Sequence, residues 1–259
     1  MGTDNVLWQV IVVSAGLAIL VWALRAATAG AAACGGLICF AMTYSGRREP
    51  WDGDLVHTAV SPLIVLFALT FLATRAGRLR KERRGFGESR RGRRSSQVAA
   101  NLGVAALTVA VPEFLIGGLR PLNSPVRYGV FAACLGALAE ATADTVSSEI
   151  GQALGGTVVL ITTGRSVPRG TDGGVSLSGS VAGMVGAALV VWAGRLWLGS
   201  DWSQVEAAAF TGGVVGLIAD SLLGATLERR GWIGNDWVNF ISTGVAAGVA
   251  GAQVIWLQR

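Results

Sequence analysis

The chain alternates long apolar stretches with short polar connections over its whole length. About eight stretches of roughly 17–24 residues carry almost no charge, and each is long enough to cross a hydrocarbon core about 30 Å thick as a helix. We place these spans near residues 6–24, 26–42, 55–74, 98–118, 127–143, 178–198, 205–226 and 237–257. The pattern predicts an all-α, polytopic helical membrane protein with about eight transmembrane helices in one bundle.

Composition leads to the same class. Of the 259 residues, 52% are hydrophobic and 14% are charged, and the mean hydropathy is +0.54. A soluble domain usually carries about 25% charged residues. Spans of about 20 residues each leave no room for a separate soluble domain, so we expect a single transmembrane domain over residues 1–259.

Cysteine and histidine usage excludes several kinds of site. Cys34, Cys39 and Cys134 lie in apolar stretches without CxxC spacing, and His57 is the only histidine. A disulfide scaffold, a thiolate metal cluster and a multi-histidine metal site are therefore not expected. Any phosphoryl or carboxylate chemistry must use Asp and Glu.

A basic segment sets the predicted orientation. The stretch from Arg75 to Arg94 holds ten of the 21 Lys and Arg residues, so residues 75–97 are expected to form a cytoplasmic loop. Alternation of the spans then puts both termini outside. The net charge of +5 would suit nucleic acid in a soluble protein. Here the charges lie between two spans without interleaved aromatic residues, so we expect contact with anionic membrane lipids and no nucleic-acid partner. Steering of an anionic substrate and a surface for a protein partner are the alternatives.

Acidic residues gather at the predicted cytoplasmic face, at the ends of the fifth and seventh spans and the start of the eighth. They are Glu140, Asp144, Glu149, Asp220, Glu228 and Asp236. Acids within membrane spans are rare and usually functional. On a continuous helix Glu140, Asp144 and Ser148 share one stripe, and oxygen ligands of this kind suit Mg²⁺. Structural ion pairs with neighbouring arginines are the alternative.

Two further polar motifs lie on the same face. The segment 167–176 is rich in glycine, follows Arg165 and precedes the sixth span, so its backbone N–H groups could cradle a phosphate, although a plain surface loop remains open. Asn235, Asn239 and Ser242 open the eighth span. These side chains could bind a base, a sugar or metal-bound water, or could join helices by hydrogen bonds.

Four ordered motifs resemble those of one integral membrane family. They are the segments 140–151, 160–176, 220–228 and 235–242, and the segment 97–101 is similar as well. The family includes transmembrane protein 19 and the plant and cyanobacterial phytyl-phosphate kinases. The likeness runs from about residue 60 to the C-terminus. It departs from the family at Val146-Ser147, Asp172, Glu228 and Asp236, where the family often has Trp-Ala, Asn, Gln and Asn.

A more distant likeness concerns Ala143-Asp144-Thr145 with Gly151 and Gly155. These residues resemble the Gly-Asp motif of phytol kinase, dolichol kinase and CDP-diacylglycerol synthase, which use CTP at the membrane surface. Asp144 would then be a metal ligand.

The family resemblance implies a phosphotransferase, a phytyl- or prenyl-phosphate kinase of the kind used in tocopherol biosynthesis. It would transfer the γ-phosphoryl group of CTP, or of another nucleoside triphosphate, to an isoprenoid monophosphate with Mg²⁺ as cofactor. A cytidylyltransferase, a lipid alcohol kinase and a lipid or ion transporter are the alternatives, and a homo-oligomer is compatible with the pattern.

Residue roles follow from this resemblance and from the spacing above. The expected metal ligands are Glu140, Asp144, Glu149 and Asp220. The expected catalytic residues are Asp144, Glu149, Asp220 and Arg165. The expected nucleotide- and phosphate-binding residues are Arg169, Gly170, Thr171, Gly173, Gly174, Ser176, Asn235 and Asn239. The expected site occupies residues 140–176 and 220–242.

Overall fold

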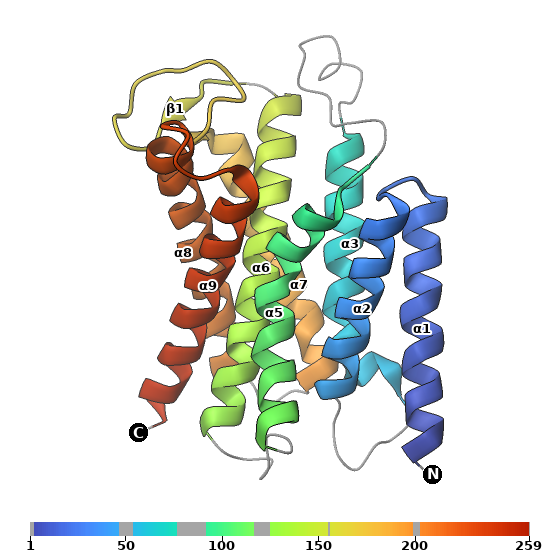
Figure 1. Cartoon of the computed structure of the whole chain (residues 1–259). Coiled ribbons are helices and arrows are strands. Elements are labelled where there is room, and N and C mark those ends of the chain that lie inside the picture. The colour runs from blue at the N-terminus through green and yellow to red at the C-terminus, as the bar shows by residue number, and fades with distance from the viewer. Residues whose placement is uncertain are drawn as a thin grey trace.

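The computed structural model describes residues 3–46, 54–76, 92–116, 125–154, 156–198 and 203–258. Within these ranges eight α-helices run side by side as one bundle (Figure 1). The helices are α1 (Thr3–Ala23), α2 (Ala29–Ser45), α3 (Val60–Arg75), α5 (Ser95–Ile116), α6 (Pro125–Leu154), α7 (Leu177–Leu198), α8 (Ser203–Leu223) and α9 (Asn235–Leu257). The shorter elements are the 3₁₀ turn η1 (Leu55–His57), the strands β1 (Val159–Leu160) and β2 (Gly174–Val175), and the π-helical segment η2 (Gly224–Glu228).

The predicted class, a polytopic helical membrane protein, is confirmed. Six of the described helices are long and apolar enough to cross a bilayer, whereas α2 and α3 are apolar but shorter. Large apolar side chains such as Trp8, Leu37 and Trp192 are exposed on the outside of the bundle. A surface of this kind is suited to contact with the hydrocarbon of a bilayer.

Helix α6 is longer than the membrane span predicted within it. The fifth span was expected to end near residue 143, but α6 continues to Leu154. The extra turns are more polar, yet they pack closely against the start of α7. A Cβ atom on Gly179 would lie 3.4 Å from the Cα atom of Gly151. This contact with α7 stabilises the helical conformation of the last turns of α6, although their residues are less hydrophobic.

Helix α6 is the centre of the bundle. It packs against α3, α5, α7, α8 and α9, and most of its residues are buried. Many of them are alanine or glycine, which allow backbones to approach closely in lipid, where helices have no hydrophobic drive to associate. For example, Gly183 of α7 faces the backbone of α6, and a Cβ atom there would lie 2.7 Å from the carbonyl oxygen of Ala143.

The connections alternate between the two ends of the bundle. Both termini lie at one end, and the strand β1 lies at the other (Figure 1). The start of α5, the segment 156–176 and the connection between α8 and α9 meet at the β1 end, which we call the site end. Most of the basic segment on which the orientation depends, residues 77–91, falls outside the described residues.

We predict that Gly183→Ala lowers the thermal stability of the protein in detergent. The added methyl group meets a backbone carbonyl that cannot move aside, and such overpacking usually costs about 1–3 kcal/mol. Thermal unfolding should shift down by several degrees. Gly244→Ala in α9 is the matched control, because a Cβ atom there meets nothing within 4 Å. Equal or greater stability of the Gly183 variant would contradict this packing account.

Candidate active site

A polar cavity of about 340 Å³ opens at the site end of the bundle. Its walls come from the start of α5, the last turns of α6, the segment 156–176, the start of α7, the end of α8 with η2, and the start of α9. Segments far apart in the chain thus contribute to one site. The volume lies within the range of about 300–1,000 Å³ that is usual for small-molecule sites.

Two carboxyl groups from different helices meet in this cavity. Asp144 of α6 and Asp220 of α8 lie within hydrogen-bonding reach of each other. The guanidinium of Arg93 is close enough to Asp144 to interact with its charge. Glu149 and Glu228 line the same cavity. Two carboxylates this close repel each other unless a proton or a cation lies between them, so the pair is suited to hold a cation.

Glu140 lies one helical turn deeper than Asp144 and is fully buried. Its carboxylate accepts a hydrogen bond from the Ser242 hydroxyl at 2.7 Å, and the same hydroxyl lies 3.5 Å from Oδ1 of Asp220. Glu140 does not line the cavity. Glu140 therefore lies outside the cavity and is linked to the site through Ser242, and the metal-binding role expected for it stays a prediction.

Amide side chains join α5 to α9 behind the carboxylates. Asn239 Nδ2 donates to Asn101 Oδ1 at 3.2 Å, and Asn101 Nδ2 donates to the carbonyl oxygen of Gln97 at 2.8 Å. Both asparagines are buried, and both line the cavity. The side chain of Asn239 thus joins helices as well as facing the site. Asn235, one turn earlier, also lines the cavity.

The segment 156–176 folds into a small hairpin. Strands β1 and β2 pair antiparallel, with Val159 opposite Val175, and Ser166 bridges to Val159 on the other side. The turn between them is held by the N–H group of Gly164, which donates to the carbonyl oxygen of Leu160 at 2.8 Å. Arg165 follows this turn directly. It is exposed and is not among the residues that line the cavity.

Arg165, which the sequence predicted to be catalytic, is therefore not brought to the cavity with the other expected residues. Spacing from the acidic motifs could not show that a tight turn carries Arg165 away from the cavity. Arg169 does line the cavity, and its guanidinium donates to the carbonyl oxygen of Gly156 at 3.4 Å.

The returning part of the hairpin has the form of an anion cradle. Gly170 and Gly173 both have positive φ, at 79° and 73°. Gly174 N–H is used internally, because it donates to the carbonyl oxygen of Thr171 at 2.8 Å. Within the described residues the N–H groups of Gly170, Asp172 and Gly173 donate no hydrogen bond to another backbone or side-chain atom. Consecutive turns of this kind form backbone concavities that bind anions.

The hairpin is held against α8 at its π-helical segment. A Cβ atom on Gly224 would lie 2.9 Å from the backbone nitrogen of Gly173, and one on Gly173 would collide with Ala225. Only glycine fits at both places. π-Helical segments occur frequently at functional sites. Here η2 begins one helical turn after Asp220 and holds the hairpin near that carboxylate.

The remaining residues of the hairpin have mixed roles. Ser176 lines the cavity, but its hydroxyl also accepts a hydrogen bond from the N–H group of Gly179 at 3.2 Å, which caps the N-terminus of α7. Thr171 lines the cavity as well, and its hydroxyl donates to the carbonyl oxygen of Pro168 at 2.7 Å. The sequence analysis expected both to bind the nucleotide, and the structure gives each a structural partner too.

Arg93 and Gln152 also line the cavity, and neither was among the site residues predicted from the sequence. Arg93 belongs to the basic segment that was assigned to membrane topology as a whole. Its guanidinium reaches into the bundle and lies 3.4 Å from the Thr145 hydroxyl of α6. The only available signal was its place two residues before α5, close to the Gln97 motif.

The site fits a divalent cation that is held by few protein ligands. No group of three or more His, Cys, Asp or Glu side chains within the described residues is arranged to hold a metal ion. The expected four-carboxylate set is thus not assembled. However, Mg²⁺ is usually bound by one or two carboxylates together with substrate phosphates and water. Asp144 and Asp220 meet that requirement beside the anion cradle.

We predict that Gly173→Ala displaces the hairpin, whereas Gly164→Ala does not. Both residues have positive φ, so alanine introduces similar backbone strain at either position. Only at position 173 does the methyl group also collide with η2, because Gly164 has nothing within 4 Å. Limited proteolysis of segment 156–176 should therefore be faster in the Gly173 variant than in the Gly164 variant. Equal rates would show that the hairpin does not depend on η2.

Comparison with known proteins agrees with the motifs. The chain is 34% identical to an uncharacterized membrane protein of Methanocaldococcus jannaschii, MJ0933, over 56% of this chain and 62% of that protein. It is 30% identical to Protein VTE6, chloroplastic, of Arabidopsis thaliana over 62% of this chain and 47% of that protein. An uncharacterized membrane protein of Synechocystis, sll0875, is 34% identical over 70% of this chain and 65% of its own length.

The chain spans between about half and two thirds of the length of these curated relatives. No solved structure matches it. Residues 12–247 match the family described as integral membrane protein DUF92. This match covers most of the chain and confirms the family that the four motifs indicate. The chain belongs to the DUF92 family of integral membrane proteins.

Proposed function

We propose that this protein is a membrane-embedded prenyl-phosphate kinase. One observation carries the proposal: the paired carboxyl groups of Asp144 and Asp220 share a cavity with a glycine-rich anion cradle and two arginines, Arg93 and Arg169. Phosphoryl transfer needs mainly positioning and neutralisation of charge. This cavity supplies cationic groups and backbone donors for phosphates, together with acidic ligands for Mg²⁺.

The nucleoside triphosphate, CTP or a related donor, would bind along the cradle. The N–H groups of Gly170, Asp172 and Gly173 and the Arg169 guanidinium would hold its phosphates. Asp144 and Asp220 would hold Mg²⁺, with Glu149 beside them, and this ion supplies charge neutralisation when bound. Asn235 lies at the opening of α9, where it is exposed and can contact the rest of the nucleotide.

The acceptor in this proposal is an isoprenoid monophosphate such as phytyl or geranylgeranyl phosphate. An oxygen of its phosphate attacks the γ-phosphorus of the donor. The bond from that phosphorus to the β–γ bridging oxygen breaks, and the nucleoside diphosphate leaves with the electron pair. Because a phosphate monoester is already ionised near neutral pH, no strong general base is needed. The lack of a histidine at the site is consistent with this step.

The depth of the site suits an encounter between a soluble donor and a lipid acceptor. Asp144 is the twentieth residue of the 30-residue helix α6. About 20 helical residues cross a hydrocarbon core, so Asp144 is expected at headgroup level and the last turns of α6 beyond it. The carboxylates therefore lie where a lipid phosphate and a water-soluble nucleotide can meet.

Homology favours the same function. The family that the motifs resemble includes phytyl-phosphate kinases, and Protein VTE6, chloroplastic, matches 62% of the chain at 30% identity. A cytidylyltransferase, a lipid alcohol kinase or a transporter would use some of the same groups. Transporter sites usually lie near the membrane midplane, whereas this cavity lies at one end of the bundle.

We predict that purified protein transfers the γ-phosphoryl group, and not the α-phosphate, of its donor. With γ-labelled CTP and a prenyl monophosphate, label should appear in the lipid as a diphosphate, while α-label should stay in the nucleotide. Lipid carrying α-label would indicate a cytidylyltransferase. Label transferred to a prenyl alcohol alone would indicate a lipid alcohol kinase, and unlabelled lipid with every donor would favour a transporter.

Asp144→Asn tests the metal role in the same assay, with Asp236→Asn as its matched control. Both changes remove one carboxylate at the site end, but Asp236 does not line the cavity. Asp144→Asn should abolish transfer and weaken nucleotide binding in the presence of Mg²⁺, while the Asp236 variant keeps both. Wild-type transfer by the Asp144 variant at limiting Mg²⁺ would exclude Asp144 as a ligand.

A cytoplasmic site is also part of the proposal, because nucleoside triphosphates are supplied from that side. The basic residues from 75 to 94 favour it. We predict that a cysteine at Ser166 is labelled only from the cytoplasmic side, whereas one at Gln204, at the opposite end of the bundle, is labelled only from outside. The native cysteines are replaced beforehand. The reverse pattern would overturn the orientation and leave the site's geometry intact.

A further inference from the structure

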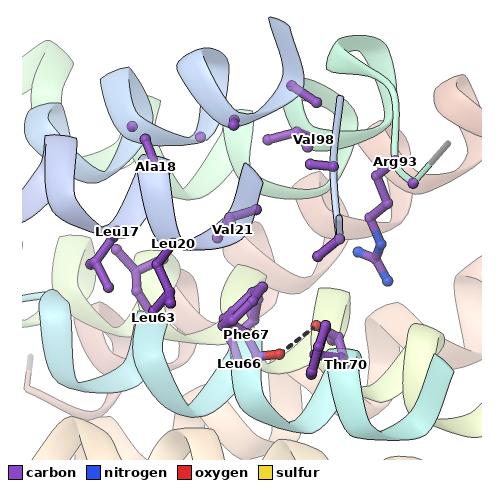
Figure 2. A pocket seen from close by; sticks show the side chains of 18 of the residues that line it. Leu17, Ala18, Leu20, Val21, Leu63, Leu66, Phe67, Thr70, Arg93 and Val98 are labelled. Atoms are coloured by element: carbon purple, nitrogen blue, oxygen red, sulfur yellow. Dashed lines mark hydrogen bonds between the residues drawn. The ribbon is translucent and has the colours of Figure 1, made fainter. Parts of the chain in front are cut away.

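A second cavity, of about 390 Å³, lies beside the polar one and is mostly apolar. It is lined by α1, α2, α3 and the start of α5. Helix α1 packs mainly against α2, and α2 makes few contacts with α3, so these helices leave space between them. Leucine, phenylalanine and alanine side chains form its walls (Figure 2).

Positive charge is concentrated at one end of this apolar cavity. Arg25, Arg75 and Arg93 all line it, and within the described lining there is no acidic side chain. Arg75 donates to the carbonyl oxygen of Leu24 at 3.1 Å and lies over the ring of Phe71. Figure 2 shows the Arg93 side chain at one end of the cavity, with Leu17, Leu20 and Leu63 at the other. A hydrocarbon cavity with a cationic end fits a lipid with an anionic head.

Arg93 belongs to both cavities. Its backbone is joined to the connection between α1 and α2, since its N–H group donates to the carbonyl oxygen of Ala26 and its carbonyl oxygen accepts from Thr28, each at 3.0 Å. Its guanidinium instead reaches Thr145 of α6, one residue after Asp144. This residue is where the apolar cavity meets the carboxylate site.

Gly92 makes this junction possible. Its φ is +75°, and a Cβ atom would lie 2.7 Å from the carbonyl carbon of Ala26. The backbone before α5 therefore lies directly against the α1–α2 connection, and Arg93 is held in place by main-chain hydrogen bonds and not by its side chain alone.

We propose that the apolar cavity binds the hydrocarbon tail of the acceptor and that Arg93 contacts the acceptor's phosphate. This inference rests on the proposed function and assigns its lipid subsite. The occupant is a single-chain isoprenoid monophosphate. A volume of about 390 Å³ is near the lower end of the range for small-molecule sites, which favours one chain over the two of a bilayer phospholipid. A terminal monoester phosphate at Arg93 also reaches the cavity that holds Asp144 and Asp220.

The experiment measures binding of a long-chain prenyl monophosphate that carries a photoreactive diazirine at the far end of its tail. We expect cross-links in α1 and α3, and we expect unlabelled prenyl monophosphate to compete much better than phosphatidylglycerol or inorganic phosphate. Arg93→Gln should weaken binding about tenfold or more, since it removes a charge-assisted contact. Arg94→Gln is the matched control, because Arg94 is exposed and lines neither cavity.

A second pair of variants tests the tail cavity without touching an arginine. Gly35 lines the cavity, and a Cβ atom there makes an ordinary contact, 3.7 Å from Val98 Cγ1. Gly35→Leu should fill the space and weaken binding of the prenyl monophosphate, with nucleotide binding unchanged. Gly248→Leu is the control, since position 248 on α9 has nothing within 4 Å and lines neither cavity.

The outcomes separate this inference from the proposed function. Cross-links outside α1–α3, or full competition by phosphatidylglycerol, would overturn the lipid subsite even if γ-phosphoryl transfer occurs. Arg93-dependent binding with cross-links in α1 and α3, but without transfer from any nucleotide, would support the subsite and count against the kinase. Unchanged binding in both Arg93→Gln and Gly35→Leu would overturn the inference.

Discussion

Close backbone contact around α6 holds the site together. Small residues line this helix, so α7, α8 and α9 can approach it closely. Side chains from all four helices then share one cavity. Gly216 of α8 illustrates the constraint, since a Cβ atom there would lie 2.6 Å from the Cγ atom of Glu140. A wider spacing would separate Asp144 from Asp220 and leave each carboxylate alone at the edge of hydrocarbon, where an unpaired charge is costly.

The same constraint explains why the polar groups form layers. The deepest layer, Glu140 with Ser242, is buried and joined by a hydrogen bond of 2.7 Å. Above it lie Asp220 and the asparagine pair, and above these lies the hairpin that rests on η2. Each layer contacts the next, so buried contacts position the groups that would face a ligand. Preorganisation of this kind is what phosphoryl transfer requires.

Much of this arrangement could be predicted from the sequence, and the failures have physical causes. Hydropathy located the eight helices because lipid-facing residues must be apolar. It located the apolar span of α6 but not the polar turns that follow residue 143, where packing against α7 continues the helix. Motif spacing brought Asp144, Asp220 and Arg169 to one face. It could not reveal that Arg165 follows a tight turn and does not line the cavity. Nor could it reveal that Arg93, one of ten Lys and Arg residues in a basic segment, is held by backbone hydrogen bonds at the junction of two cavities.

The order of the two cavities along the chain has an evolutionary consequence. The polar cavity is lined by residues from Arg93 onward, whereas most of the lining of the apolar cavity comes from α1, α2 and α3. Substitutions in the first three helices can therefore change the length or shape of the apolar cavity without altering any carboxylate, cradle amide or asparagine. The polar site can thus stay unchanged in evolution while the lipid that the apolar cavity accepts changes. Gly92 and Arg93 lie where the two cavities meet.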